Sequence, residues 1–182
     1  DGDDPVVLKS EFILSLCEQL MGAGKLSAKE KSIIDRCTAL CYHTYIQNGC
    51  EGTVPTLRDF HAELLRQPET EATDVALAIE LFTKGSLNTF AKPTNVDTNS
   101  RILCYDIRDL GKQLLPVGML VVLDSVFNRI VRNRKLGRNT WVYIDEIYLL
   151  FQHEYSANFL FTLWKRVRKY GACCTGLTQN VD

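Results

Sequence analysis

Two adjacent carboxylates, Asp145 and Glu146, directly follow a short apolar segment at 141–144. That segment is typical of a buried β-strand, and ligands of parallel α/β sheets gather at the carboxyl ends of the strands. Successive residues of an extended chain point to opposite sides, so the two acids can take different roles. One can hold Mg²⁺ through water, while the other orients or deprotonates an attacking water. The alternative is a pair of solvated acids that simply cap a strand.

An apolar strand followed by an acid pair is the Walker B pattern of nucleotide hydrolases. Gln179 follows the next expected strand, at 172–177, in the same way. Its amide offers both a donor and an acceptor, so it can reach a γ-phosphate or the attacking water. Taken alone, Thr178, Gln179 and Asn180 are better explained as a polar turn.

Three cations, Arg166, Arg168 and Lys169, lie near the end of the helix expected between these two strands. We interpret them as groups that contact phosphate, one or more of them across a subunit boundary. Their favourable interaction with the helix dipole is the simpler explanation for some of them. A second basic stretch, at 132–138, is interpreted as a solvated helix end because few aromatic residues interleave it.

The segment 22–27 resembles a phosphate-binding loop but does not match its pattern. That loop requires Gly, four residues, Gly, Lys, and then a Ser or Thr whose hydroxyl holds Mg²⁺. Here Gln19 stands at the leading Gly position and Leu26 at the hydroxyl position. The segment also follows an expected helix rather than a strand, so we interpret it as the end of one helix and the start of the next.

The chain has seven Cys residues, most of them within apolar periodic segments, and no Cys-x-x-Cys pair. This usage is typical of reduced thiols that fill the core of a cytosolic protein. A zinc site built from Cys37, Cys41, His43 and Cys50 is an alternative. It is disfavoured because His43 points away from the helical face that the first two share.

Apolar periodicity divides the chain into a helical first half and a mixed second half. Helices are expected at 6–21, 28–48, 56–65 and 71–84, and a Ser27–Glu30 capping box should start the second of them. The second half predicts strands at 102–107, 141–144 and 172–177, with helices at 117–134 and 156–169 between them. Alternating strands and helices imply a parallel sheet, so we expect an α/β layer preceded by an all-helical subdomain.

Length and composition are those of an ordinary globular protein. The 182 residues carry 21 Lys and Arg against 22 Asp and Glu, which argues against a protein that coats nucleic acid. The longest apolar run, near 118–131, is broken by Asp124, Asn128 and Arg129, so no membrane span is expected. No signal peptide is expected, because the first residues are acidic where a signal peptide is basic. A chain without an initiator Met suggests a piece of a longer protein.

Several segments together resemble the large ATPase of type IV secretion and conjugative transfer systems, in the form carried by Gram-positive mobile elements. They are, in order, LSAKEKSIIDR at 26–36, GSLNTF at 85–90, TNVD at 94–97, the strand with its acid pair at 141–146, WKRVRKYG at 164–171 and TGLTQN at 175–180. The resemblance covers essentially the whole chain, and this order of segments is more specific than any one of them.

The resemblance implies a partial RecA-like ATPase core at 86–182, with the helical subdomain at 1–85 inserted in the ATPase. It implies Mg-ATP hydrolysis, with Asp145 on the Mg²⁺ shell, Glu146 as catalytic carboxylate and Gln179 as γ-phosphate sensor. Arg166, Arg168 and Lys169 match the family's basic motif near the nucleotide. The implied partners are other copies of the chain, as a hexamer, and other components of the secretion channel. The implied location is the cytoplasmic side of the membrane, and no sequence-specific binding of nucleic acid is expected.

Two departures from the family pattern limit these expectations. Tyr148 stands where relatives often have His, and no P-loop occurs in these residues. We expect the P-loop upstream of residue 1, so that the chain alone is inactive. A DNA-translocating coupling ATPase of the same superfamily and a non-enzymatic docking module of the secretion apparatus stay open as alternatives.

Overall fold

The computed structural model describes residues 5–22, 24–152 and 154–179. The chain divides into two compact units between Cys104 and Tyr105. Residues 86–104 therefore group with the helices of the first unit, whereas the sequence interpretation placed them with the ATPase core. The assignment of 1–85 and 86–182 to two functional domains stays a prediction.

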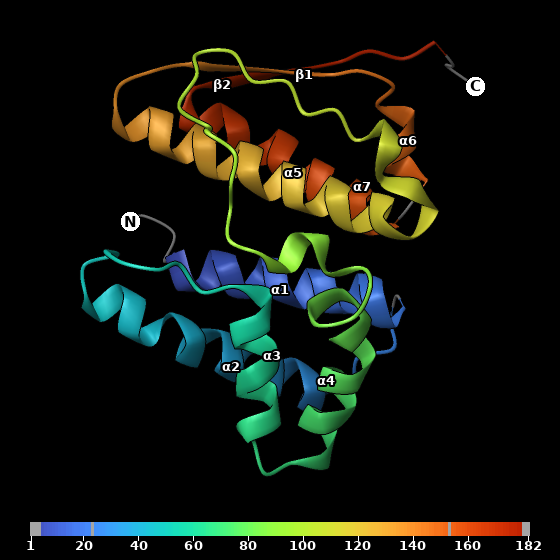
Figure 1. The fold of residues 1–182 in the computed structure, drawn as a ribbon. Helices are drawn as coiled ribbons and strands as arrows, with labels where there is room; N and C mark the ends of the chain where they lie inside the picture. Colours follow the sequence, from blue (N-terminus) through green and yellow to red (C-terminus); the bar gives the residue numbers. More distant parts are fainter. Residues whose placement is uncertain (1–4, 23, 153, 180–182) are drawn as a thin grey trace. The chain divides into compact units, whose positions relative to one another are not determined.

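In the part of the first unit that the structure describes, there are four helices and one short 3₁₀ turn (Figure 1). The elements are α1 (Pro5–Met21), α2 (Ala28–Gln47), α3 (Leu57–Arg66), α4 (Thr70–Thr83) and η1 (Asn88–Ala91). The predicted capping box is confirmed: Glu30 accepts a hydrogen bond from the Ser27 N–H at 2.7 Å, and Ser27 Oγ accepts one from the Glu30 N–H. Thr56 and Asp59 cap α3 in the same way.

Apolar side chains from all four helices form the core of this first unit. Leu16, Ile34, Leu64 and Val75 come one from each helix, and each is at most 2% exposed. Burying a side chain of this size stabilises the fold by about 1.5–3 kcal/mol. His61 is buried among them, and two ion pairs, Arg36–Glu69 and Lys29–Glu71, join α2 to the start of α4 at the surface.

The second unit is a small parallel sheet with helices packed on it (Figure 1). Its elements are η2 (Arg108–Leu110), α5 (Gly111–Lys135), β1 (Thr140–Ile144), α6 (Tyr148–Phe151), α7 (Glu154–Val167), η3 (Arg168–Tyr170) and β2 (Ala172–Gly176). Strands β1 and β2 pair in parallel, and α5 and α7 pack against each other and against the sheet. The predicted α/β class, with an all-helical unit before it, is confirmed.

One face of this sheet is left open within the described residues. Val142 and Ile144 are partly buried, whereas Trp141 and Tyr143, which alternate with them along β1, are 60% and 68% exposed. The alternation follows from the period of two in a strand. The covered face is therefore the one that α5 and α7 pack against.

Two sequence-based expectations in this unit are wrong. Residues 102–107 do not form a strand: they pair with no described strand, and Tyr105 is tied to α5 by a 2.9 Å hydrogen bond to Ser125. A strand needs a ladder partner, which periodicity alone cannot supply. Helix α5 also begins at Gly111 rather than near Val117, so that Pro116 lies inside its early turns.

Helix α5 is also the one described helix long and apolar enough to cross a membrane. Within the unit it packs against α7, β1 and η3, and Leu120, Leu123 and Ile130 are buried. A core helix of a folded protein can have the same length and composition, so these two properties alone are weak evidence of a membrane span.

Candidate active site at the carboxyl end of the sheet

The pairing of β1 with β2 brings the acid pair and the Gln179 segment to the same edge of the sheet. The register runs from Thr140 opposite Ala172 to Ile144 opposite Gly176. Hydrogen bonding continues past the strands: the Leu177 N–H donates to the Ile144 carbonyl at 2.8 Å, and the Ile147 N–H donates to the Leu177 carbonyl at 3.0 Å. The two segments therefore leave the sheet side by side, as the sequence predicts.

The backbone turns sharply at the acid pair. Glu146 has φ = 49°, in the left-handed region that costs a non-Gly residue about 1–2 kcal/mol. Asp145 stabilises this turn, because its Oδ1 accepts a hydrogen bond from the Glu146 N–H at 3.0 Å. Helix α6 then begins two residues later, at Tyr148. The strained conformation separates the two carboxylates, leaving Asp145 exposed and Glu146 partly buried.

One carboxylate oxygen of this pair lacks a partner. Glu146 Oε2 is buried and has no hydrogen-bond partner among the described residues. A buried carboxylate oxygen without a partner is costly, and such atoms are rare in folded proteins. A hydrated cation or a water held at this edge would satisfy it, so the donor set fits Mg²⁺ coordinated through water.

Gly176 and Ile147 hold the acid-bearing turn against β2, a role that sequence reasoning missed. A Cβ at position 176 would lie 2.6 Å from Ile147 Cδ1 and 3.2 Å from Ile147 Cγ2. The absent side chain of Gly176 lets Ile147 pack on the end of β2. The signal was present in the segment at 175–180, where a Gly interrupts a strand, since such a Gly often marks a close approach.

The three cations lie at the other edge of the sheet. Arg168 and Lys169 are in η3, directly before β2, and Arg166 is in the last turn of α7. A five-residue strand at ~3.3 Å per residue places them roughly 16 Å from the acid pair. Within one subunit the structure brings Asp145, Glu146 and the Gln179 segment together, and it does not bring these cations to them. Asn180 lies outside the described residues.

The other two candidate sites do not gain support. Residues 22–27 connect α1 to α2, and the Gly22 N–H donates to the Glu18 carbonyl at 2.9 Å, as at a helix end. This agrees with the interpretation as a helix junction. The described residues contain no group of three or more His, Cys, Asp or Glu side chains placed to hold a metal, so the zinc alternative has no geometric support. Cys37 is buried and Cys50 is exposed, both as free thiols.

Comparison with known proteins gives a structural likeness. No protein-family model and no curated protein sequence matches the chain. Among solved structures, it is similar to the VirB4 of Thermoanaerobacter pseudethanolicus, with a TM-score of 0.80 and 20% sequence identity. The match covers 99% of this chain and 51% of that chain, so this chain spans about half the length of its neighbour. The likeness shows that this chain has the fold of the corresponding part of VirB4.

Proposed function

We propose that this chain is part of an ATP-hydrolysing motor that powers type IV secretion or conjugative DNA transfer. The observation that carries the proposal is the parallel pairing of β1 and β2, which places the acid pair beside the Gln179 segment. The likeness to VirB4 and the order of the segments in the sequence support the same function.

Each polar group at this edge has a proposed role in the reaction. Asp145, which is exposed, binds the water shell of Mg²⁺. Glu146, with its unpartnered buried oxygen, orients and deprotonates the attacking water, and Gln179 contacts the γ-phosphate. When bound, Mg²⁺ neutralises charge that develops on the phosphate oxygens. These assignments use residues that the fold brings to one place.

Arg166, Arg168 and Lys169 are proposed to contact the phosphates of a neighbouring subunit. Their position at the opposite edge of the sheet from Asp145 supports contact between subunits rather than within one. A cation supplied in this way stabilises transition-state charge only after assembly. The motor is accordingly proposed to act as a homo-oligomer, a hexamer, together with other channel components at the inner face of the cell membrane.

The decisive variant is Glu146→Gln, tested in a chain that joins these residues to a P-loop. The substitution keeps the size of the side chain and removes the base, so ATP turnover should be lost while ATP binding is retained. Unchanged turnover would refute the role of Glu146. The 182 residues alone should bind ATP weakly and hydrolyse none, because the amides and Lys of a P-loop supply much of the phosphate affinity. Micromolar ATP affinity in calorimetry would contradict this.

Two other functions are separated by simple observations. A DNA-translocating coupling ATPase would show ATPase activity stimulated by DNA, with the salt dependence of phosphate contacts. A non-enzymatic docking module would lack the P-loop in its upstream sequence. An intact P-loop there supports the motor.

A further inference from the structure

The two units of the chain carry opposite net charge. Residues 1–104 contain 10 Lys and Arg against 15 Asp and Glu, a net charge of −5, whereas residues 105–182 contain 11 against 7, a net charge of +4. The near-neutral total therefore conceals an acidic unit and a basic one. Opposite patches on one chain allow one copy to attract another.

The basic second unit contains a turn that exposes an apolar side chain. This basic turn, residues 134–138, comprises the last two residues of α5 and the three residues after it. Hydrogen bonds from the Gly137 N–H to the Arg134 carbonyl and from the Arg138 N–H to the Asn133 carbonyl hold it. Leu136 at its centre is 55% exposed. Among the described residues, Arg134, Lys135 and Arg138 form no salt bridge, so their charge is available to a partner.

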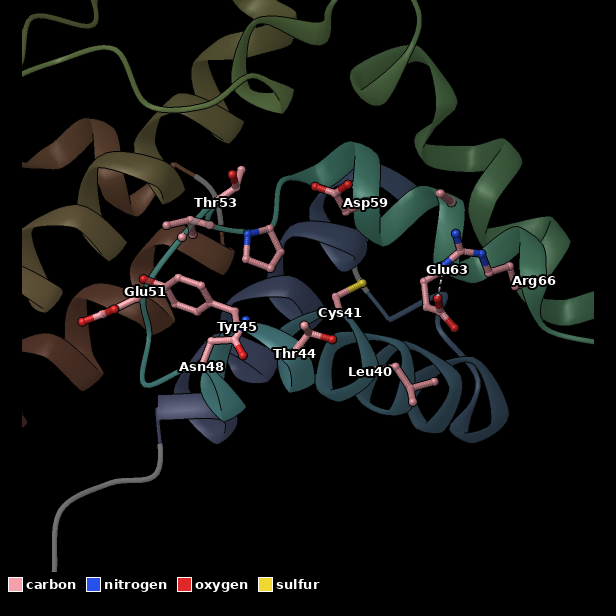
Figure 2. Close-up of a pocket in the computed structure, with 14 residues that line it drawn as sticks. Leu40, Cys41, Thr44, Tyr45, Asn48, Glu51, Thr53, Asp59, Glu63 and Arg66 are labelled. Atoms are coloured by element: carbon pink, nitrogen blue, oxygen red, sulfur yellow. Dashed lines mark hydrogen bonds and ion pairs between the residues drawn. The ribbon is translucent and has the colours of Figure 1, made fainter.

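The first unit contains a groove with the complementary character (Figure 2). It has a volume of about 480 Å³ and lies between the second half of α2, the loop at 48–55 and α3. Leu40 and Val54 line it and are 48% and 52% exposed. The ring of Tyr45 lies near Glu51, and Leu40 lies farther along α2, beyond Thr44 and Cys41 (Figure 2). The groove thus offers an apolar surface to an incoming side chain.

Carboxylates outnumber cations around this α2–α3 groove. Glu51, Asp59 and Glu63 line it, against a single cation, Arg66, which pairs with Glu63 at 2.9 Å. Hydrogen bonds from Thr56 hold the pKa of Asp59 below its usual value, so Asp59 is ionised at neutral pH. Figure 2 shows Asp59 and Glu51 on either side of the loop residue Thr53. The groove therefore favours an apolar side chain that arrives with cations on both sides.

We propose that the basic turn of one copy docks in the α2–α3 groove of a second copy. Leu136 enters the groove at the end lined by Val54 and Tyr45, and Lys135 and Arg138 face Glu51 and Asp59. The occupant is a second copy because the same chain carries both complementary surfaces. Such a contact is head-to-tail and leaves a free groove at one end and a free turn at the other, so it propagates to a closed ring or a filament.

This inference deepens the proposed assembly of the motor, but its test needs no nucleotide. Failure of the contact would leave the roles of Asp145 and Glu146 untouched, and loss of those roles would leave the contact untouched. Self-association of the 182-residue chain is measured by sedimentation over a range of concentrations, at low and at high salt. We expect association that weakens with salt, because the charges at the groove rim are screened.

Leu136→Asp and Val54→Lys should each weaken self-association by about tenfold or more, since each replaces an apolar anchor with a charge that the facing surface repels. Leu77→Asp is the matched control, because Leu77 on α4 is 61% exposed and does not line the groove, and it should change nothing. The three variants replace exposed side chains, and circular dichroism checks that each is folded.

Mixing the turn variant with the groove variant gives the most specific test of the contact. The Leu136→Asp chain keeps its groove and the Val54→Lys chain keeps its turn, so the mixture should form a 1:1 complex that does not grow further. A wild-type chain that stays monomeric at the highest concentration overturns the proposal. So does association that survives both variants, association lost in Tyr143→Lys instead, or a mixture that gives no complex.

Discussion

Ile147 packs on Gly176 so closely that a methyl group at position 176 would lie 2.6 Å from Ile147 Cδ1. This contact links the end of β2 to the turn that carries Asp145 and Glu146. It explains how a two-stranded sheet holds its acid pair in a defined position.

Gly176→Ala should therefore destabilise the second unit by about 1–3 kcal/mol, the usual cost of overpacking. Urea unfolding measures the change. Thr175→Ala, at an exposed neighbouring position of β2, is the control and should have little effect. Ile147→Val removes Cδ1, so adding it to Gly176→Ala should restore part of the lost stability. No restoration in the double variant would show that the contact is not the cause.

Glu146→Gly should raise the free energy of unfolding by up to about 1 kcal/mol, because the left-handed backbone at φ = 49° no longer strains a side chain. The unpartnered buried oxygen of Glu146 disappears at the same time. Glu146→Ala also removes the oxygen but keeps the backbone strain, so it should be less stable than Glu146→Gly. Equal stability of the two variants would contradict the strain. A gain in stability on losing the proposed base would be typical of a functional residue.

Acidification should weaken the first unit through His61. Burial, followed by the charge of Lys84, lowers the pKa of His61 from 6.5, so below pH 6.5 the unfolded chain binds a proton that the folded chain does not. The stabilisation is complete above pH 6.5 and is lost as the pH falls toward the folded pKa. Unfolding midpoints measured over a pH series of about 7.5 to 5, on either side of the ordinary His pKa of ~6.5, test the effect.

Two variants separate His61 from other titrating groups. His61→Gln should flatten this part of the pH profile, since Gln does not titrate. His43→Gln should leave it unchanged, because His43 is exposed on α2. An unchanged slope in His61→Gln would assign the pH dependence to the carboxylates.

Periodicity and capping chemistry predicted the helices of the first unit closely, because those signals are local. Ser27 and Glu30 mark the start of α2 within three residues of chain, and the Asp145–Glu146 pair marks the end of β1. Features that depend on distant partners were missed. Residues 102–107 have the alternation of a strand but pair with no described strand. The fit of Ile147 to Gly176 joins residues 29 positions apart.

The position of the basic residues relative to the acid pair could also be predicted only once the sheet topology was known. From the sequence, Arg168 and Lys169 could be placed only near the end of a helix. The parallel register sets that helix end at the amino edge of β2 and the acid pair at the carboxyl edge of β1. Because the two strands are parallel, the cations that precede β2 and the acids that follow β1 lie at opposite ends of the sheet.

The open face of the sheet carries an exposed Trp, whose fluorescence depends on whether that face is covered. The indole of Trp141 stands in water on that side, next to the phenol of Tyr143. A polypeptide that binds to this face will bury the indole of Trp141 and change its fluorescence emission. The fluorescence of the chain will therefore report binding at this face.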